Sequence, residues 1–137
     1  MTNQFTVLER GETYPDIGFI DGDIILDGGK TYPDIVFING DVVIYPLVKV
    51  PNLKVINGHA TIYHGVKVPN LKVINGNAVI FEEVDAPNLE TIKGDVSIYP
   101  GACVPKLEII GGDTYFNINE GADVFNLKFI GGKAYIP

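Results

Sequence analysis

The sequence predicts an all-β protein in which a single chain winds into a triangular parallel β-helix, with 18 residues in each coil. Three observations lead to this fold class: a period of 18 residues, short stretches of alternating apolar residues, and turn residues at fixed places between them. The stretches between the turn residues are too short for an α-helix of ordinary length. We therefore expect about seven coils, each with three short strands and stacked about 4.8 Å from the next.

Two columns of recurring residues define the period. Prolines and glycines each step by 18 without a slip, and a fixed period of this kind makes every repeat one structural unit. The prolines are Pro15, Pro33, Pro51, Pro69, Pro87 and Pro105, and the glycines are Gly22, Gly40, Gly58, Gly76, Gly94 and Gly112. The clearest copies read PNLKVINGHATIYHGVKV, PNLKVINGNAVIFEEVDA and PNLETIKGDVSIYPGACV.

Apolar residues at every sixth position predict one core residue on each side of the triangle. These are Leu8, Tyr14, Ile20, Leu26, Tyr32, Ile38, Ile44, Val50, Ile56, Ile62, Val68, Ile74 and Ile80, and the series continues to Phe116. Two further core columns are expected, one at Ile35, Leu53, Leu71, Leu89, Leu107 and Leu127 and one at Val42, Ala60, Ala78, Val96 and Ala134. Burying about six side chains per coil, at about 1.5 to 3 kcal/mol for each large one, offsets the cost of ordering the chain.

Three bends per coil separate the strands. We expect the first at Asn-Gly and Asp-Gly dipeptides, such as Asn57-Gly58, because these residues enter positive φ at low cost. The prolines lack an N–H and so belong at a second bend or at the first residue of a strand. The third bend is variable and reads His64-Gly65, Glu82-Glu83 or Pro100-Gly101.

Stacked coils place like residues over one another, which predicts ladders of side chains. We expect an amide ladder of Asn52, Asn70 and Asn88. We also expect an outward aromatic ladder, made of Tyr45, Tyr63, Phe81 and Tyr99. Charges are partly balanced between coils, since Lys72 is followed by Glu90 and Lys67 by Asp85.

We interpret residues 1–137 as one solenoid domain. Residues 1–13 form an N-terminal partial coil or cap, 14–116 the regular coils, 117–124 a loop with a two-residue insertion, and 125–137 the final coil. The first residues lack the pattern of a signal peptide, and no apolar run reaches the length of a membrane helix. The one cysteine, Cys103, fits a reducing compartment. Together these features predict a cytoplasmic protein of a bacterium or of an infected host cell.

The unit L-x-x-I-x-G-x-A/V-x-I occurs at Leu53, Ile56, Gly58, Ala60 and Ile62. It resembles the repeat of receptor L domains and of β-solenoid proteins from bacteria and phages, over about residues 14 to 137. The resemblance implies a right-handed helix that serves as a recognition surface, although the cysteines that staple receptor ectodomains are missing here. The six-residue period is also similar to the left-handed helix of hexapeptide-repeat acyltransferases. We favour the right-handed coil, and the left-handed one stays open.

Residue types offer little chemistry. His59 and His64 lie in one coil but at different parts of it. Stacking would bring Asp16 near Asp34, Asp23 near Asp41, and Asp95 near Asp113, where a bound cation could relieve the repulsion; a solvated acidic stripe is the interpretation that we favour. We therefore expect no enzyme, no catalytic residue, no cofactor and no metal site.

A binding surface is the functional expectation. Its candidate residues are Tyr45, Tyr63, Phe81, Tyr99, Phe19, Phe37, Asp23, Asp41, Asp95 and Asp113. A further column could form an outward apolar stripe or be turned inward by a bend: Phe19, Phe37, Val55, Val73, Thr91, Ile109 and Phe129. The final residues 134–137 have no polar cap, so self-association through that end or through the stripe is expected.

We expect a non-enzymatic protein-interaction module, of the kind that serves as a bacterial or phage accessory or inhibitor protein. The formal charge of −7 favours a basic protein partner and disfavours direct binding of nucleic acid or of an anionic membrane. Two alternatives stay open. One is an acidic decoy that mimics nucleic acid and inhibits a DNA- or RNA-binding defence enzyme, and the other is a hexapeptide-like acyltransferase or a glycan-active enzyme.

Overall fold

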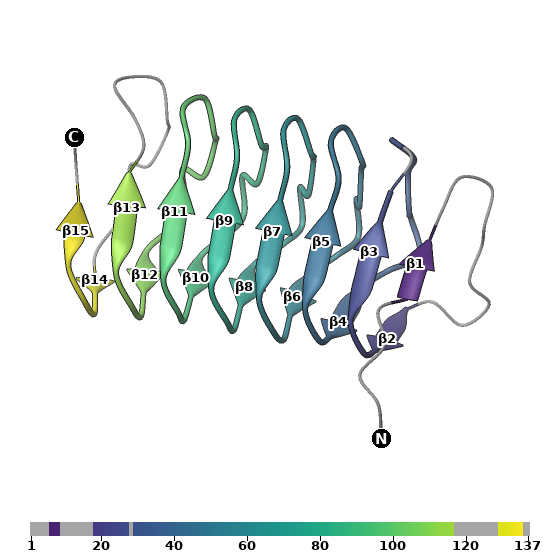
Figure 1. The fold of residues 1–137 in the computed structure, drawn as a ribbon, viewed down its shortest axis with the longest axis horizontal. Coiled ribbons are helices and arrows are strands. Elements are labelled where there is room, and N and C mark those ends of the chain that lie inside the picture. Colours follow the sequence, from purple (N-terminus) through teal and green to yellow (C-terminus); the bar gives the residue numbers. More distant parts are fainter. Residues whose placement is uncertain (1–5, 9–17, 28, 117–128, 136–137) are drawn as a thin grey trace.

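The computed structural model describes residues 6–8, 18–27, 29–116 and 129–135. These residues form an all-β parallel solenoid without helices, with about five coils of roughly 18 residues (Figure 1). The predicted fold class is therefore confirmed. We expected about seven coils; parts of the outermost expected coils, and the whole of the expected insertion loop at 117–124, lie outside the described residues. None of the described segments is a helix long and apolar enough to cross a membrane.

Two parallel sheets form two sides of each coil. The eight-stranded sheet contains β1 (Thr6–Leu8), β3 (Ile24–Leu26), β5 (Val42–Ile44), β7 (Ala60–Ile62), β9 (Ala78–Ile80), β11 (Val96–Ile98), β13 (Thr114–Phe116) and β15 (Ala134–Tyr135), in that order. The seven-stranded sheet contains β2 (Phe19–Asp21), β4 (Phe37–Asn39), β6 (Val55–Ile56), β8 (Val73–Ile74), β10 (Thr91–Ile92), β12 (Ile109–Ile110) and β14 (Phe129–Ile130). The third side is a column of single parallel bridges that joins Thr31, Lys49, Lys67, Asp85 and Cys103.

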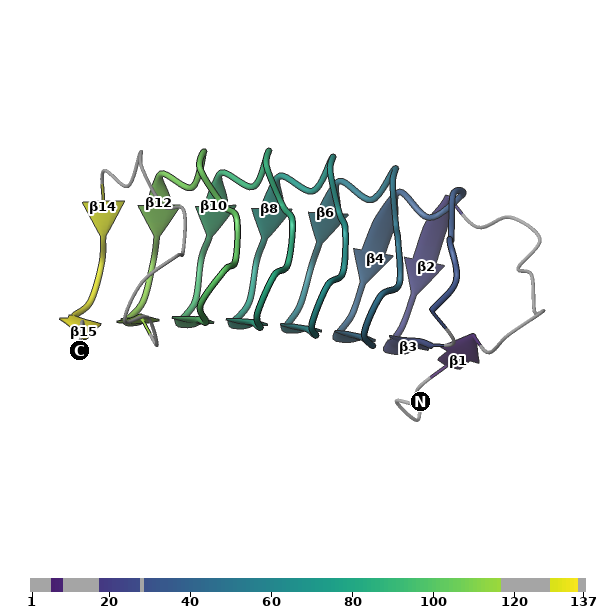
Figure 2. The same ribbon diagram turned by 90° about the horizontal axis from the view of Figure 1, so that it is seen from above.

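The chain visits the three sides in a constant order. In Figure 1 the strands of the eight-stranded sheet stand side by side and point the same way. In Figure 2 the molecule is seen from above, and the seven-stranded sheet lies along the other side of a straight rod. Each coil is therefore one rung of a rod whose strands run across its long axis.

The register confirms the period of 18. Ile44 pairs with Ile62 in one sheet, and Ile38 pairs with Ile56 in the other. The step changes only near the C-terminal end of the described chain, where Thr114 pairs with Ala134, 20 residues away. The parallel pairing of these two strands continues across this longer step.

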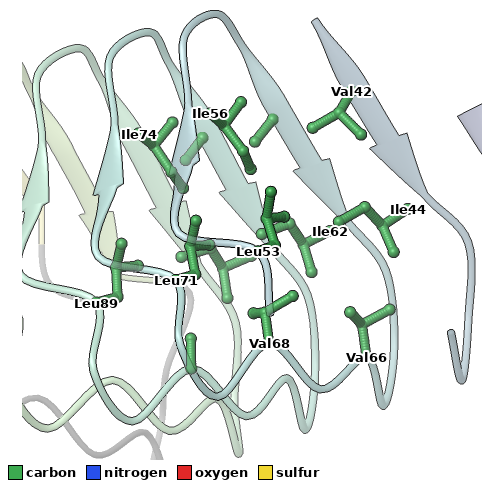
Figure 3. Close-up of a cluster of buried hydrophobic side chains, with 14 of the residues drawn as sticks. Val42, Ile44, Leu53, Ile56, Ile62, Val66, Val68, Leu71, Ile74 and Leu89 are labelled. Carbon is green, nitrogen blue, oxygen red and sulfur yellow. The ribbon is translucent and has the colours of Figure 1, made fainter. Parts of the chain in front are cut away.

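The core runs along the axis of the rod as columns of aliphatic side chains. Figure 3 shows Leu53, Leu71 and Leu89 in one column and Ile56 and Ile74 in another, and all of them are fully buried. The columns predicted at Leu53 and at Val42 are confirmed wherever side chains are described. One core position departs from its column: Thr114 follows Val96, is fully buried, and its hydroxyl has no hydrogen-bond partner.

The corner glycines fulfil a role different from the one predicted. Within the described column at Gly22, Gly40 and their repeats, Gly22 has positive φ, and the later glycines do not. Their requirement is close approach of stacked backbones: a Cβ built on Gly58 would lie 2.4 Å from the carbonyl oxygen of Gly40. The expectation of positive φ at Asn-Gly is therefore wrong for these coils, and glycine is needed because there is no room for a side chain.

Positive φ occurs instead at the variable third corner. Its residues have φ values of 63°, 68°, 71°, 59° and 79° at Gly29, Leu47, Gly65, Glu83 and Gly101. Glycine alternates here with a larger residue, and the larger side chain covers the next glycine, since a Cβ on Gly65 would lie 2.8 Å from Cδ2 of Leu47. This corner thus accepts the left-handed conformation in non-glycine residues, at an energetic cost.

Candidate interaction surfaces

The predicted aromatic ladder is confirmed. The ring centroids of Tyr45 and Tyr63 lie 5.5 Å apart, and those of Tyr63 and Phe81 lie 4.8 Å apart with planes 4° from parallel. Phe81 and Tyr99 continue the stack at 4.8 Å. Because each inner ring is covered on both faces by its neighbours, the ladder presents ring edges to its surroundings and keeps its faces for itself.

The ladder is one edge of a continuous outward surface on the eight-stranded sheet. Residues alternate along a strand, so Asp41, Val43 and Tyr45 point outward from one coil while Val42 and Ile44 are buried. Repeating this pattern gives three parallel columns, which we call the aromatic face. Its polar column is Asp23, Asp41, His59, Asn77, Asp95 and Asp113, its central column is Ile25, Val43, Thr61, Val79, Ser97 and Tyr115, and its aromatic column is Tyr45, Tyr63, Phe81 and Tyr99.

The polar column of the aromatic face is a hydrogen-bonded ladder that links each coil to the next. Oδ1 of Asp23 accepts a hydrogen bond from the backbone N–H of Asp41 at 2.8 Å, and Oδ1 of Asp41 accepts one from His59 at 2.8 Å. The pattern continues through Asn77, Asp95 and Asp113 and ends at the N–H of Lys133. These carboxylates are thus spaced by backbone donors, so the ladder accounts for their stacking without a cation.

His59 takes part in this ladder as an acceptor. Its Nδ1 accepts a hydrogen bond from the N–H of Asn77 at 2.9 Å. Asp, Asn and His all carry an acceptor on Cγ, so the three residue types reach the same place. The recurrence of these three residue types at one position of the repeat predicts the ladder, and sequence reasoning missed this signal. Among the described residues, no group of three or more His, Cys, Asp and Glu could hold a metal ion.

Asparagines form two further columns, and one differs from the prediction. The side-chain amides of Asn52, Asn70 and Asn88 each donate to a proline carbonyl of the preceding coil at 2.6 Å, so the ladder expected between their amides is wrong. The amide ladder lies instead at the corner before the glycines. There Asn57 donates to Oδ1 of Asn39 at 2.8 Å, and Asn75 donates to Oδ1 of Asn57 at 3.0 Å.

The second outward surface lies on the seven-stranded sheet. We call it the phenylalanine stripe: Phe19, Phe37, Val55, Val73, Thr91 and Ile109. Phe19 is 55% exposed and Ile109 is 41% exposed, and the residues between them are half-buried. The rings of Phe19 and Phe37 stack with centroids 5.0 Å apart. Of the two orientations that the sequence left open, the outward one is correct. The side chain of Phe129, the seventh residue of that column, lies outside the described part of the structure.

The remaining candidates lie apart from both surfaces. His64 is at the third corner, where its Nε2 is 3.6 Å from Oε1 of Glu83, and both side chains are mostly exposed. Cys103 is half-buried on the third side, in the bridge column with Asp85. His59 and His64 are therefore not brought together, and Asp16 lies outside the described residues.

The aromatic face and the phenylalanine stripe are thus carried by different sheets of one rod. Comparison with protein-family models, with curated proteins and with solved structures finds no match to the chain.

Proposed function

We propose that the chain is a non-enzymatic protein-interaction module that binds a protein partner through the aromatic face. The observation that carries this proposal is the arrangement of that face. A column of acceptors, a largely apolar column and a stack of aromatic edges run side by side along the regular coils. Few side chains need to be ordered when a partner binds, because the ladders hold them already, and such preorganisation favours affinity.

The chemistry of the aromatic face favours a protein over a nucleic acid. Bases stack on the faces of aromatic rings, but the inner rings of Tyr63 and Phe81 have both faces covered within the ladder. Ring edges, tyrosine hydroxyls and the half-buried Val43 and Val79 offer an amphipathic contact area of the kind common in protein interfaces.

Charge supports a basic partner. The formal charge of the chain is −7, and Asp23, Asp41, Asp95 and Asp113 line one edge of the aromatic face. Such a surface increases the rate at which a basic protein finds it and disfavours acidic partners. The resemblance of the repeat to receptor L domains and to bacterial and phage solenoids agrees with a recognition role, as an accessory or inhibitor protein in the cytoplasm of a bacterium or an infected cell.

The test is capture of protein partners by the tagged chain from a lysate of its own host cells, quantified by mass spectrometry. Thr61→Lys places a bulky charge in the central column of the aromatic face and is expected to lower capture about tenfold. Thr31→Lys is the matched control, because Thr31 is exposed on the third side, away from both outward surfaces. Equal capture by both variants contradicts the proposal.

Added salt separates the contribution of charge from that of the apolar and aromatic columns in the same capture experiment. An interface that rests mainly on charge loses most of its capture at high salt, because mobile ions screen exposed charges. An interface that rests on the apolar and aromatic columns retains most of it. We expect added salt to reduce capture of the partner without abolishing it. Complete loss in salt would favour the alternative of an acidic decoy for a basic cleft.

A further inference from the structure

The same stripe on a second copy of the chain can cover the phenylalanine stripe. We infer that two copies associate through the stripe in antiparallel orientation, with the seven-stranded sheets face to face. This inference concerns a different sheet from the aromatic face and does not depend on the function proposed above. It rests on the exposure of the stripe and on the order of charges beside it.

The stripe is an exposed apolar surface on a straight rod. Phe19 and Ile109 at its two ends are 55% and 41% exposed, and Val36 beside it is 36% exposed. The six stripe residues from Phe19 to Ile109 are separated by five steps of about 4.8 Å each, so the stripe extends about 24 Å. An outward apolar stripe with polar residues beside it is a feature that marks sites of contact.

A column of charged residues runs directly beside the part of the stripe from Val55 to Ile109, one residue earlier in each of these four coils, whereas Gly18 and Val36 hold this position beside Phe19 and Phe37. Its members are Lys54, Lys72, Glu90 and Glu108, and we call it the charge column. Its backbone is held in line by hydrogen bonds from the N–H of Lys72 to the carbonyl of Lys54, of Glu90 to Lys72, and of Glu108 to Glu90, each 2.9 Å long. The two positive charges occupy adjacent coils, and the two negative charges occupy the next two.

This order of charges is complementary to its own reverse. In an antiparallel pair, a two-fold axis in the interface and perpendicular to the rods places every column opposite the same column read backwards. With the axis between the coils of Lys72 and Glu90, Lys72 faces Glu90 of the second copy. Lys54 then faces Glu108, so four pairs of opposite charge form across the interface. A parallel arrangement would place the charge column opposite a different column.

The same axis matches the apolar residues. Val73 faces Thr91 of the second copy, and Val55 faces Ile109, so the stripe from Val55 to Ile109 is covered by itself. Phe19 lies beyond this overlap, with no stripe residue opposite it. The neighbouring polar column places Asn70 opposite Asn88, and no like charges meet there. A closed two-fold pair uses each stripe once, so association stops at two copies and does not continue into filaments.

Charge reversal tests the orientation by analytical ultracentrifugation over a range of protein concentrations. The wild-type chain is expected to form a dimer whose affinity falls with added salt. K54E/K72E makes the charge column entirely acidic, and E90K/E108K makes it entirely basic. Each double variant is expected to lose about 100-fold in dimer affinity, because all four facing pairs become repulsive.

Rescue gives the decisive result. A mixture of the two double variants is expected to form a heterodimer, because every facing pair is then opposite in charge. The quadruple variant K54E/K72E/E90K/E108K restores the self-complementary order and is expected to dimerise like the wild type. Circular dichroism confirms that each variant is folded, and Thr61→Lys on the other sheet is expected to dimerise normally.

The inference is overturned by a wild-type chain that is monomeric over the whole range, by double variants that dimerise as tightly as the wild type, or by double variants that do not recover on mixing. Growth beyond two copies also overturns it, because end-to-end contacts through the edge strands β14 and β15 would then account for association.

Discussion

The corner glycine of each coil separates two polar columns that behave differently. In the column before it, side chains bond to side chains, from Asp21 through Asn39 and Asn57 to Asn75. In the column after it, each side chain accepts from the backbone of the next coil, from Asp23 as far as the N–H of Lys133. The first ladder ends at Asn75, whose buried Oδ1 has no partner, because Lys93 stands where the next asparagine would be.

The difference shows what a solenoid ladder demands of its residues. A ladder of amides needs a donor and an acceptor in every coil, so one substitution ends it. A ladder on the backbone needs only an acceptor, because the N–H is always present. It therefore tolerates Asp, His and Asn in turn, and it spans all the described coils.

The largest effect is expected at the corner glycine, because the hydrogen bonds of both polar columns depend on close stacking of the coils there. Gly58→Ala places a Cβ 2.4 Å from the carbonyl oxygen of Gly40, so the coils must separate locally. We expect a loss of about 3 kcal/mol in the free energy of unfolding, measured with urea. Gly18→Ala is the control, because a Cβ there has its nearest neighbour at 4.0 Å. Equal losses in the two variants would show that space between coils is not the reason for glycine.

Removal of one acceptor breaks the ladder on the backbone. Asp41→Ala leaves the N–H of His59 without its side-chain acceptor, and we expect a loss of about 2 kcal/mol in unfolding free energy. Asp41→Asn keeps Oδ1 in place, as Asn77 does naturally in the same column, and is expected to retain most of the stability. A large loss in the asparagine variant would mean that charge, and not the acceptor, is what the column needs.

Thr114, the inward-facing residue that follows Asp113 of this ladder, carries an unsatisfied hydroxyl group. Thr114 is fully buried without a partner for its hydroxyl, whereas Val96 fills the equivalent place one coil earlier. Thr114→Val is expected to raise the unfolding free energy by about 1.5 kcal/mol, because it removes the cost of burying that hydroxyl. Thermal unfolding measures the gain, and a destabilised variant would reveal a hydrogen bond to the hydroxyl.

The smallest effect is expected from a substitution that extends the ladder of amides by one coil. Lys93→Asn supplies a donor to the buried Oδ1 of Asn75, and we expect a gain of about 1 kcal/mol in the same unfolding measurement. Lys93→Ala removes the lysine without adding a donor and serves as the control. If both variants gain equally, removal of the lysine explains the effect, and continuation of the ladder does not.

Most of the fold could be predicted because the solenoid converts distance along the chain into distance in space. Residues such as Leu53 and Leu71, 18 apart in the sequence, lie in adjacent coils, so the core columns and the aromatic ladder follow from counting. The outward surfaces were harder. The orientation of Phe19 was left open, because a bend near it could have turned the column either way.

The sequence by itself determined the period, the inward columns and the stacking of like side chains, because parallel strands in register repeat every local choice in each coil. Only the tertiary structure decided what each repeated residue does: that Gly58 makes room for a carbonyl, that Leu47 adopts positive φ, and that Asp41 accepts from a backbone N–H. Those roles depend on how closely two coils approach and at what angle. Such distances are set by the packing of the whole rod and are not encoded in the period of the repeat.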